Sequence, residues 1–256
     1  MAHDDSCSFN FDHDLKLLNN DITITQSNAN TVLIDNNNQL YVNNQIQSLS
    51  AEQQQLVDNY ADNIRILIPE VTSIAIEGVG LGIDAASMAL GILLGEGDPD
   101  YLDFVQRIEG LGDQIVANLD ATQFDSQELE KTFTEDFEQE IESFVEQTVN
   151  ELTPRLMAKV MASALSNGGD TSEFEQRAEN LEADIEAMIE PRAEILGQRA
   201  EEVCEIILTL DAIESDLVAS GLDSMDLITP SKDGNINFNN LDKYRDNKGF
   251  PIDLNM

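Results

Sequence analysis

The pattern of apolar and polar positions changes character near residue 50. Before it, short runs with alternating or β-branched residues are separated by asparagine-rich breaks, as in IDNNNQLYV, where three asparagines join two such runs. Alternation with period two is typical of half-buried strands, and asparagine tolerates the left-handed backbone of tight turns. Residues 7–48 therefore predict a small antiparallel β-meander, with Ile22 and Ile24 on one face.

After the meander the apolar period becomes that of a helix. Ser50 and Gln53 have the spacing of a capping box, which predicts a helix over about 51–68. Pro69 is expected to break this helix or to begin the first turn of a new one, because proline lacks the backbone N–H that a helix interior needs. A second helix, rich in small residues, should follow over about 70–94.

Three further helices are predicted in the rest of the chain. The first should cover about 99–119 behind an Asp98 cap, and the second should begin near Ser126 and be kinked or divided at Pro154. The last should run from about Ser172 to Ser220. Its apolar stripe slips by one residue near Pro191 and Gly197, which predicts a bend, and Gly221 should end it.

The expected fold class is mainly α, of the α+β type, with a small N-terminal antiparallel β-meander packed on a set of long, kinked helices. The meander (1–49) and a helical body (50–221) are expected to form one domain. A tail (222–256), rich in Asn, Asp, Gly and Lys, is expected to be extended or poorly ordered. More than half of the residues should be helical, and strands should lie almost wholly before residue 50.

Charge narrows the range of partners. The 256 residues include 50 acidic and 13 basic side chains, for a net charge of −37, while 41% of the residues are hydrophobic. A field of this sign repels nucleic acid and anionic lipid, so neither is an expected partner. The hydrophobic content supports a packed core rather than disorder. Divalent cations are expected only as weak surface ligands, and no cofactor is predicted.

The most apolar segment is GVGLGIDAASMALGILLG, which carries Asp84 and is bounded by Glu77 and Glu96. It is too short and too interrupted to span a bilayer, so no membrane span is predicted, although contact with a membrane stays open. Its glycine spacing is not that of a dinucleotide or phosphate loop. The small residues at 78, 82, 86, 91 and 95 are expected to let helices approach closely.

Few residues have the pattern of a chemical site. His3, His13 and Asp14 are weak candidates for a transition-metal site, but two histidines near a chain end are more often incidental, so no metal site is predicted. The Asp/Asn-rich stretch 232–242 lacks the central glycine and closing acid of a calcium loop. Catalytic residues cannot be assigned, because carboxylates are abundant and no serine or cysteine has a nearby base.

The two cysteines, Cys7 and Cys204, lie nearly 200 residues apart. They have neither the close ligand spacing of a zinc site nor a CxxC redox motif. Two interpretations stay open on these grounds: two free thiols in a cytoplasmic protein, or one disulfide in an oxidising compartment.

The order of features resembles the YggN family of proteobacterial proteins, which has no assigned activity. The similar parts are the early Cys7, the hairpin TVLIDNNNQLYVNNQIQSLSAEQQQLVDNY, and VCEIILTLDAIESDLV, which resembles a cysteine-containing closing helix. The resemblance covers Cys7 to Val218, and the tail after Gly221 has no counterpart in it. It implies a periplasmic protein whose signal peptide is removed or absent from this sequence. It favours a Cys7–Cys204 disulfide and supplies no catalytic residues.

The expected function is therefore that of an uncharacterised, exported periplasmic protein. It should be non-enzymatic and bind a protein or small molecule through its helical surface. One alternative is a hydrolase or lyase with a dispersed carboxylate site, which a pocket with convergent carboxylates of raised pKa would favour. Another is an acidic, cation-binding envelope protein. A large exposed apolar patch on the helices would favour the binding protein.

Overall fold

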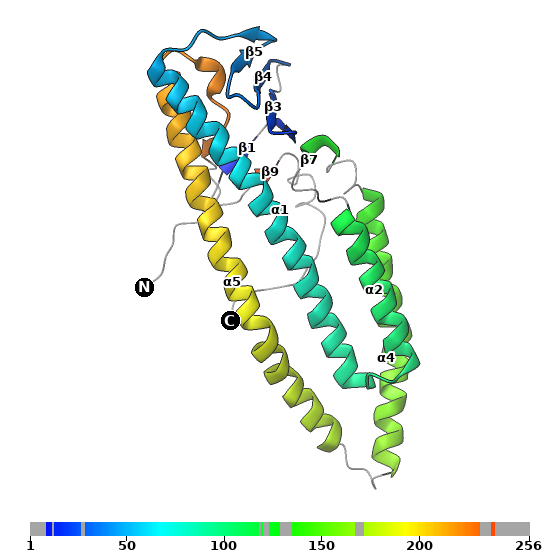
Figure 1. Cartoon of the computed structure of the whole chain (residues 1–256). Coiled ribbons are helices and arrows are strands. Elements are labelled where there is room, and N and C mark those ends of the chain that lie inside the picture. The colour runs from blue at the N-terminus through cyan, green and yellow to red at the C-terminus, as the bar shows by residue number, and fades with distance from the viewer. Residues whose placement is uncertain are drawn as a thin grey trace. The chain divides into compact units, whose positions relative to one another are not determined.

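Four long helices dominate the part of the chain that the computed structural model describes, which is residues 9–11, 13–26, 29–117, 119, 123–128, 135–166, 172–230 and 237–238. The expected fold class is confirmed, because a small antiparallel meander packs against long helices (Figure 1). The helices are α1 (Ala51–Leu94), α2 (Pro99–Ala117), α4 (Glu135–Ser166), α5 (Ser172–Ala219) and the short 3-10 turn η1 (Asp223–Met225).

The strands form two sheets. The larger is antiparallel in the order β6-β5-β4-β3-β2-β7, and the smaller has the order β8-β1-β9. Strands β7, β8 and β9 lie outside the first 50 residues and the sequence pattern did not predict them, because each is only two or three residues long. The strands are β1 (Phe9–Phe11), β2 (Asp14–Leu18), β3 (Asp21–Thr25), β4 (Thr31–Ile34), β5 (Leu40–Val42), β6 (Gln45–Ile46), β7 (Gln123–Asp125), β8 (Thr229–Pro230) and β9 (Asn237–Phe238).

The predicted faces of the meander are confirmed. Ile22 pairs with Ile34 and Ile24 with Val32 across β3 and β4, and all four side chains are fully buried. Two-residue asparagine turns join the flanking strands: Asn19 and Asn20 lie between β2 and β3, and a second asparagine pair joins β5 to β6. All four asparagines have positive φ, which matches the right-handed twist of a hairpin.

The prediction that Pro69 ends the first helix is wrong, because α1 is one helix of 44 residues with Pro69 inside it. An internal proline costs about 3 kcal/mol. Burial on one face continues through the proline, at Ile64, Ile68 and Thr72, and this burial offsets the loss of one backbone hydrogen bond. Helix α4 likewise contains Pro154.

The predicted helix ends are confirmed where the sequence has capping residues. Ser50 Oγ accepts a hydrogen bond from the Gln53 backbone N–H at 3.2 Å, and Gln53 Oε1 accepts one from the Ser50 N–H at 2.9 Å. At the end of α5, Gly221 has φ +98°, and the Leu222 N–H donates to the Leu217 carbonyl at 3.0 Å. These bonds form a Schellman motif, which satisfies carbonyls that the helix leaves free.

The chain divides into two compact units. Unit 1 contains residues 1–68, 122–125 and 201–256, and unit 2 contains 69–121 and 126–200. The predicted boundaries at 49 and 221 follow the change of element type, whereas these units divide within α1 and α5. The domain division expected from the sequence stays a prediction.

Unit 1 has a dense apolar core. It holds nearly all of the large apolar side chains that are buried in the described residues, whereas those of unit 2 are Leu94, Phe104 and Leu152. The unit 1 core consists of Leu17, Ile22, Ile24, Val32, Ile34, Leu40, Val57, Tyr60, Ala61, Ile64, Ile68, Val203, Ile207, Leu210, Ile213, Leu217, Met225, Leu227 and Ile228.

The beginning of the predicted tail belongs to this core. Met225, Leu227 and Ile228 are at most 6% exposed, and Gln26 Nε2 donates to the Ser224 carbonyl at 3.1 Å. The sequence predicted an extended or poorly ordered tail from residue 222. Met225, Leu227 and Ile228 are packed in the core and residues 229–230 form strand β8, while the order of the tail as a whole stays a prediction. The polar residues around these three apolar side chains concealed their role in the sequence.

Candidate functional site

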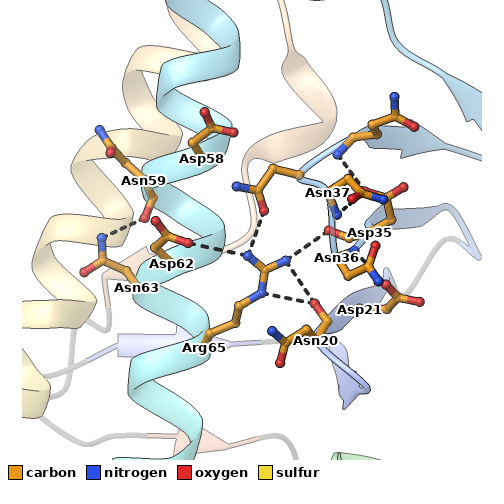
Figure 2. Close-up of polar contacts among 12 residues, drawn as sticks. Asn20, Asp21, Asp35, Asn36, Asn37, Asp58, Asn59, Asp62, Asn63 and Arg65 are labelled. Atoms are coloured by element: carbon orange, nitrogen blue, oxygen red, sulfur yellow. Dashed lines mark hydrogen bonds and ion pairs between the residues drawn. The ribbon is translucent and has the colours of Figure 1, made fainter.

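The most extensive polar cluster of unit 1 is centred on Arg65 of α1. Its guanidinium donates to the Asn20 carbonyl at 2.9 and 3.1 Å, to the Asp35 carbonyl at 3.0 Å and to Asn38 Oδ1 at 2.7 Å. Figure 2 shows this side chain reaching from the helix into the turns of the meander. A weaker contact to Asp62 spans 3.5 Å.

This cluster fixes structure rather than leaving groups for chemistry. Arg65 binds the β2–β3 turn and the β4–β5 turn at once, so it holds both to α1. The second turn is also closed from within, because Asp35 Oδ1 accepts hydrogen bonds from the backbone N–H groups of Asn37 and Gln39 at 2.8 and 2.9 Å. A fork of charged donors placed on carbonyl oxygens is well suited to such positioning.

A second cluster lies within the core of unit 1. The Glu214 side chain on α5 is 2% exposed. Its Oε1 accepts a hydrogen bond from the Tyr60 hydroxyl at 2.7 Å, and its Oε2 accepts from the backbone N–H groups of Leu227 and Ile228 at 2.8 and 2.7 Å. The carboxylate thus ties α1, α5 and the 222–230 segment together.

Burial raises the pKa of Glu214 to about 7, although its three hydrogen bonds act in the opposite direction. Burial also raises the pKa of Tyr60 well above its usual value, and the neighbouring Glu214 carboxylate adds to the effect. A carboxyl group of raised pKa can act as a general acid or base. Both oxygens of Glu214 are nevertheless occupied by groups of the chain itself, so its evident role is structural.

Ion pairs hold the helices of unit 2 together. Arg199 of α5 contacts Glu70 at 2.6 Å and Glu77 at 2.7 Å on α1, and seven residues earlier Arg192 contacts Asp84 at 2.5 Å. From Glu77 to Asp84 the chain advances by seven residues on α1, while their partners on α5 go back by seven, so the two helices run antiparallel in this unit. The hydrogen bonds that Arg199 donates to the two glutamates raise its pKa.

Helices α2 and α4 form a second antiparallel pair. Arg107 lies over the Phe144 ring, 5.0 Å from its centroid, and Phe104 stacks on the same ring at 5.8 Å. Further along, Arg155 pairs with Asp100, and Lys159 pairs with Asp98. The hydrogen bond from Lys159 lowers the pKa of Asp98.

Every lysine and arginine whose side chain the structure describes is ion-paired with an acid of its own unit. Because the acids outnumber the bases so strongly, the charge that remains exposed is negative. The pairs involve Lys16, Arg65, Arg107, Arg155, Lys159, Arg192 and Arg199.

Unit 2 also exposes many large apolar side chains. Val145 and Val149 of α4 are 49% and 55% exposed, and Leu165, near the end of this helix, is 82% exposed. Few apolar side chains are buried among the described residues of this unit, so its helices place apolar surface in water. Exposed apolar surface can mark a site where a protein binds a partner. The further exposed side chains of this unit are Leu102, Met157, Met161, Met188 and Ile195.

Comparison with known families places this architecture. Residues 7–228 match the model of a family described as a protein of unknown function (DUF2884). The chain belongs to the DUF2884 family. No curated protein and no solved structure matches the chain.

The DUF2884 match covers nearly all of the chain, from Cys7 to Ile228. It therefore extends ten residues beyond Val218, where the resemblance to the YggN family was placed. It ends at Ile228, so the buried residues Met225, Leu227 and Ile228 belong to the family region as well as to the core. The YggN name, the proteobacterial origin and the periplasmic location stay predictions.

The DUF2884 match includes both cysteines, but the structure describes only Cys204. This residue lies on α5, partly exposed, between Val203 and Ile207, which are each 8% exposed. The described part of the chain contains no free cysteine. Cys7 lies outside the described residues, so its predicted bond to Cys204 stays a prediction.

Two of the three weak metal candidates lie in the described structure. His13 and Asp14 are neighbours in the chain at the start of β2. His3 lies outside the described residues, and so does the stretch 232–242 except for Asn237 and Phe238. Among the residues that are described, no group of three or more His, Cys, Asp or Glu side chains is placed to hold a metal ion.

The glycine-rich part of α1 differs from the expectation. A Cβ added at Gly78, Gly82 or Gly95 would meet no atom within 4 Å, so the predicted close helix approach is wrong there. A close approach is found at Gly91, where a Cβ would lie 3.2 Å from the Tyr101 ring. It also occurs at Gly112 of α2, where a Cβ would collide with the Ile83 side chain.

By length and composition, α1 could cross a membrane, since 18 consecutive residues have a mean hydropathy of 1.6 and 11% of them are buried. Two of its acids, Glu77 and Asp84, are however paired with arginines of α5. Charges inside a bilayer are costly, so these pairs favour contact with protein and water. The prediction of no membrane span stays a prediction.

No sequence pattern singled out Arg65, Glu214 or the exposed end of α4. Glu214 had a usable signal, because it is an acid between Ile213 and Leu217 in an apolar stripe. Met157 and Met161 have an apolar signal in the sequence, but their exposure depends on which helices lie beside them. Arg65 gave no signal beyond its charge.

Proposed function

We propose that this chain is an exported, non-enzymatic protein that binds a partner through the surface of its long helices. The exposed apolar side chains of unit 2 carry the proposal. They lie on helices that are held in place by ion pairs rather than by a deep core, which leaves apolar surface available for a partner.

The charged groups of the chain support binding over catalysis. In the described residues, the buried carboxyl group of highest pKa, Glu214, has both oxygens occupied by Tyr60 and by the backbone of 227–228. Arg65, the best-connected cation, is fully used in holding turns. The helical surface is thus the part of the molecule left for a function.

Export to the periplasm is part of the same proposal. Its supports are the resemblance to the YggN family and the lack of a free cysteine among the described residues. A bond between Cys7 and Cys204 would close a loop of nearly 200 residues, for which the chain-entropy model gives a stabilisation of about 5 kcal/mol as an upper limit.

Location is tested with the full gene product expressed in its native host. We expect it in the osmotic-shock fraction, with no thiol reacting with a maleimide reagent after denaturation without reductant. Cys204→Ser is the control and should expose one reactive thiol. Two reactive thiols in wild-type periplasmic material would contradict the proposed bond.

Binding is tested by photocrosslinking in the same cells. A benzoylphenylalanine placed at Met161 of unit 2 should form discrete adducts, whereas the same group at Leu208 of unit 1, which is 52% exposed, should not. If neither these nor further exposed positions on α4 and α5 give adducts, the proposed binding function is wrong.

A further inference from the structure

The last turns of α4 form an apolar overhang. The pair between Lys159 and Asp98 marks the point where α2 begins beside α4, since Asp98 caps α2. Helix α4 continues beyond this point to Ser166, and Figure 1 shows it extending past the connection between α1 and α2. This stretch of α4 therefore lacks α2 as a neighbour.

An apolar ridge begins just before Lys159 and continues into the overhang. Met157, Met161 and Leu165 follow each other at intervals of four residues and are 60%, 64% and 82% exposed. Residues four apart form the ridges that pack into the grooves of another helix. Methionine is flexible and polarisable, and it adapts to partners of differing shape.

The charge beside the ridge is unevenly distributed. Residues 152–169 contain no acid, and their two bases, Arg155 and Lys159, are both ion-paired. The next helix begins with an acidic stretch, because residues 172–190 of α5 contain seven acids and one arginine. The ridge is thus an apolar strip free of acids, in a chain whose net charge is −37.

We propose that the ridge Met157–Met161–Leu165 binds an amphipathic helix of a partner protein whose apolar face is flanked by basic residues. This inference rests on the proposed function. Such a helix would lay its apolar face on the ridge, as in helix-in-groove recognition, and its lysines or arginines would be attracted by the negative charge of the chain. A second copy of this chain fits less well, because both copies carry the same net charge of −37 and repel each other.

The test uses a defined probe, an 18-residue peptide with leucines on one helical face and lysines on the other. Its fluorescence anisotropy should report micromolar binding to the wild-type protein. The combined change Met157→Gln, Met161→Gln and Leu165→Gln should weaken binding at least tenfold. Because these substitutions keep the net charge, a loss distinguishes docking on the ridge from general attraction between opposite charges.

The matched control is a second triple variant, Ile46→Gln, Ile66→Gln and Leu208→Gln. These side chains of unit 1 are 59%, 57% and 52% exposed, so their replacement removes similar apolar surface elsewhere. We expect its affinity to stay within twofold of the wild type. A peptide with glutamates in place of lysines should not bind. A scrambled Leu/Lys peptide should bind the wild type and both triple variants with the same low affinity.

Four outcomes would overturn the inference. They are unchanged binding by the ridge variant, equal binding of the glutamate peptide, a wild-type dimer that dissociates in the ridge variant, and ridge-dependent flotation with phosphatidylcholine vesicles. The last two would identify a second copy or a lipid surface as the occupant. Discrete crosslinks at Met161 to partners without a basic amphipathic helix would leave the proposed function intact while this inference fails.

Discussion

Single side chains in unit 1 join segments that are distant in the sequence. Arg65 binds two turns of the meander, and Glu214 binds a tyrosine of α1 and the backbone of the 222–230 segment. Both are charged groups at positions with little exposure, where an unsatisfied charge is costly and a satisfied one fixes geometry. Their roles lead to two predictions about stability.

Replacing Glu214 by glutamine should make stability less dependent on pH. The folded pKa of about 7 lies above the unfolded value of 4.5, so the folded state binds the proton more tightly. The stabilisation that proton binding by Glu214 gives the folded state is fully present below about pH 4.5 and is lost as the pH rises through about 7. The free energy of unfolding should be measured with urea at pH 4.5 and at pH 8. Its value for Glu214→Gln, relative to that of the wild type, should rise by up to about 3 kcal/mol between the two pH values.

A difference between the two proteins that does not change with pH would show that Glu214 keeps an ordinary pKa. The comparison removes the other carboxylates from the result, because they titrate alike in both proteins. The isosteric amide can still accept from the backbone of 227–228 and donate to Tyr60.

Replacing Arg65 by lysine should destabilise unit 1 by about 2–3 kcal/mol, even though the charge is kept. Lysine cannot reproduce the planar fork that reaches Asn20, Asp35 and Asn38 together. Lys16→Met is the control, since its pair with Asp125 is half-exposed and should be worth less than about 1 kcal/mol. Equal losses in urea unfolding would mean that the fork of Arg65 adds nothing.

At the scale of elements, local sequence signals and burial act together. Helix ends occur where Ser50 and Gly221 supply the missing hydrogen-bond partners or backbone geometry. Pro69 does not end α1, because continued burial along one face, at Ile64, Ile68 and Thr72, outweighs the loss of one hydrogen bond. Glycines also differ in role, since Gly221 ends a helix whereas Gly78 lies inside one.

Two glycine-to-alanine substitutions should have opposite effects. Gly221→Ala should cost about 1–2 kcal/mol, because its φ of +98° is unfavourable for any residue with a Cβ. Gly78→Ala should stabilise by about 0.5–1 kcal/mol, since it lies inside α1 and a Cβ there meets nothing within 4 Å. Guanidinium unfolding measures both, and a stabilising Gly221→Ala would contradict the assigned helix end.

At the scale of the whole molecule, the dominant property is the net charge of −37. The described basic side chains are paired and the acids are in large excess. The main effect expected of added salt is therefore to screen the repulsion between these acids. The same negative surface is the reason to expect basic partners.

Raising the salt concentration from 20 mM to 0.5 M should raise the melting temperature by at least about 3 °C, which corresponds to roughly 1 kcal/mol. At 0.5 M the Debye length falls to roughly 4 Å, shorter than most distances between surface charges. Magnesium chloride at equal ionic strength tests whether divalent cations add a specific effect. An unchanged melting temperature would show that repulsion between acids does not limit stability.

The sequence by itself determined the features that depend on neighbours along the chain. These are the alternation of Ile22 and Ile24, the asparagine turns, the capping box at Ser50 and the helix stop at Gly221. Each is decided by a period or by backbone geometry within a few residues.

Only the tertiary structure decided the continuity of α1 through Pro69, the burial of Glu214 and residues 225–228, and the exposure of the ridge on α4. These depend on contacts between distant segments, such as Tyr60 and Glu214, which lie 154 residues apart, and the local pattern holds no information on such contacts. An apolar residue such as Leu165 has the same sequence signal whether it is buried or 82% exposed. Whether another helix lies beside it is settled by packing, and that exposure is what defines the candidate binding surface.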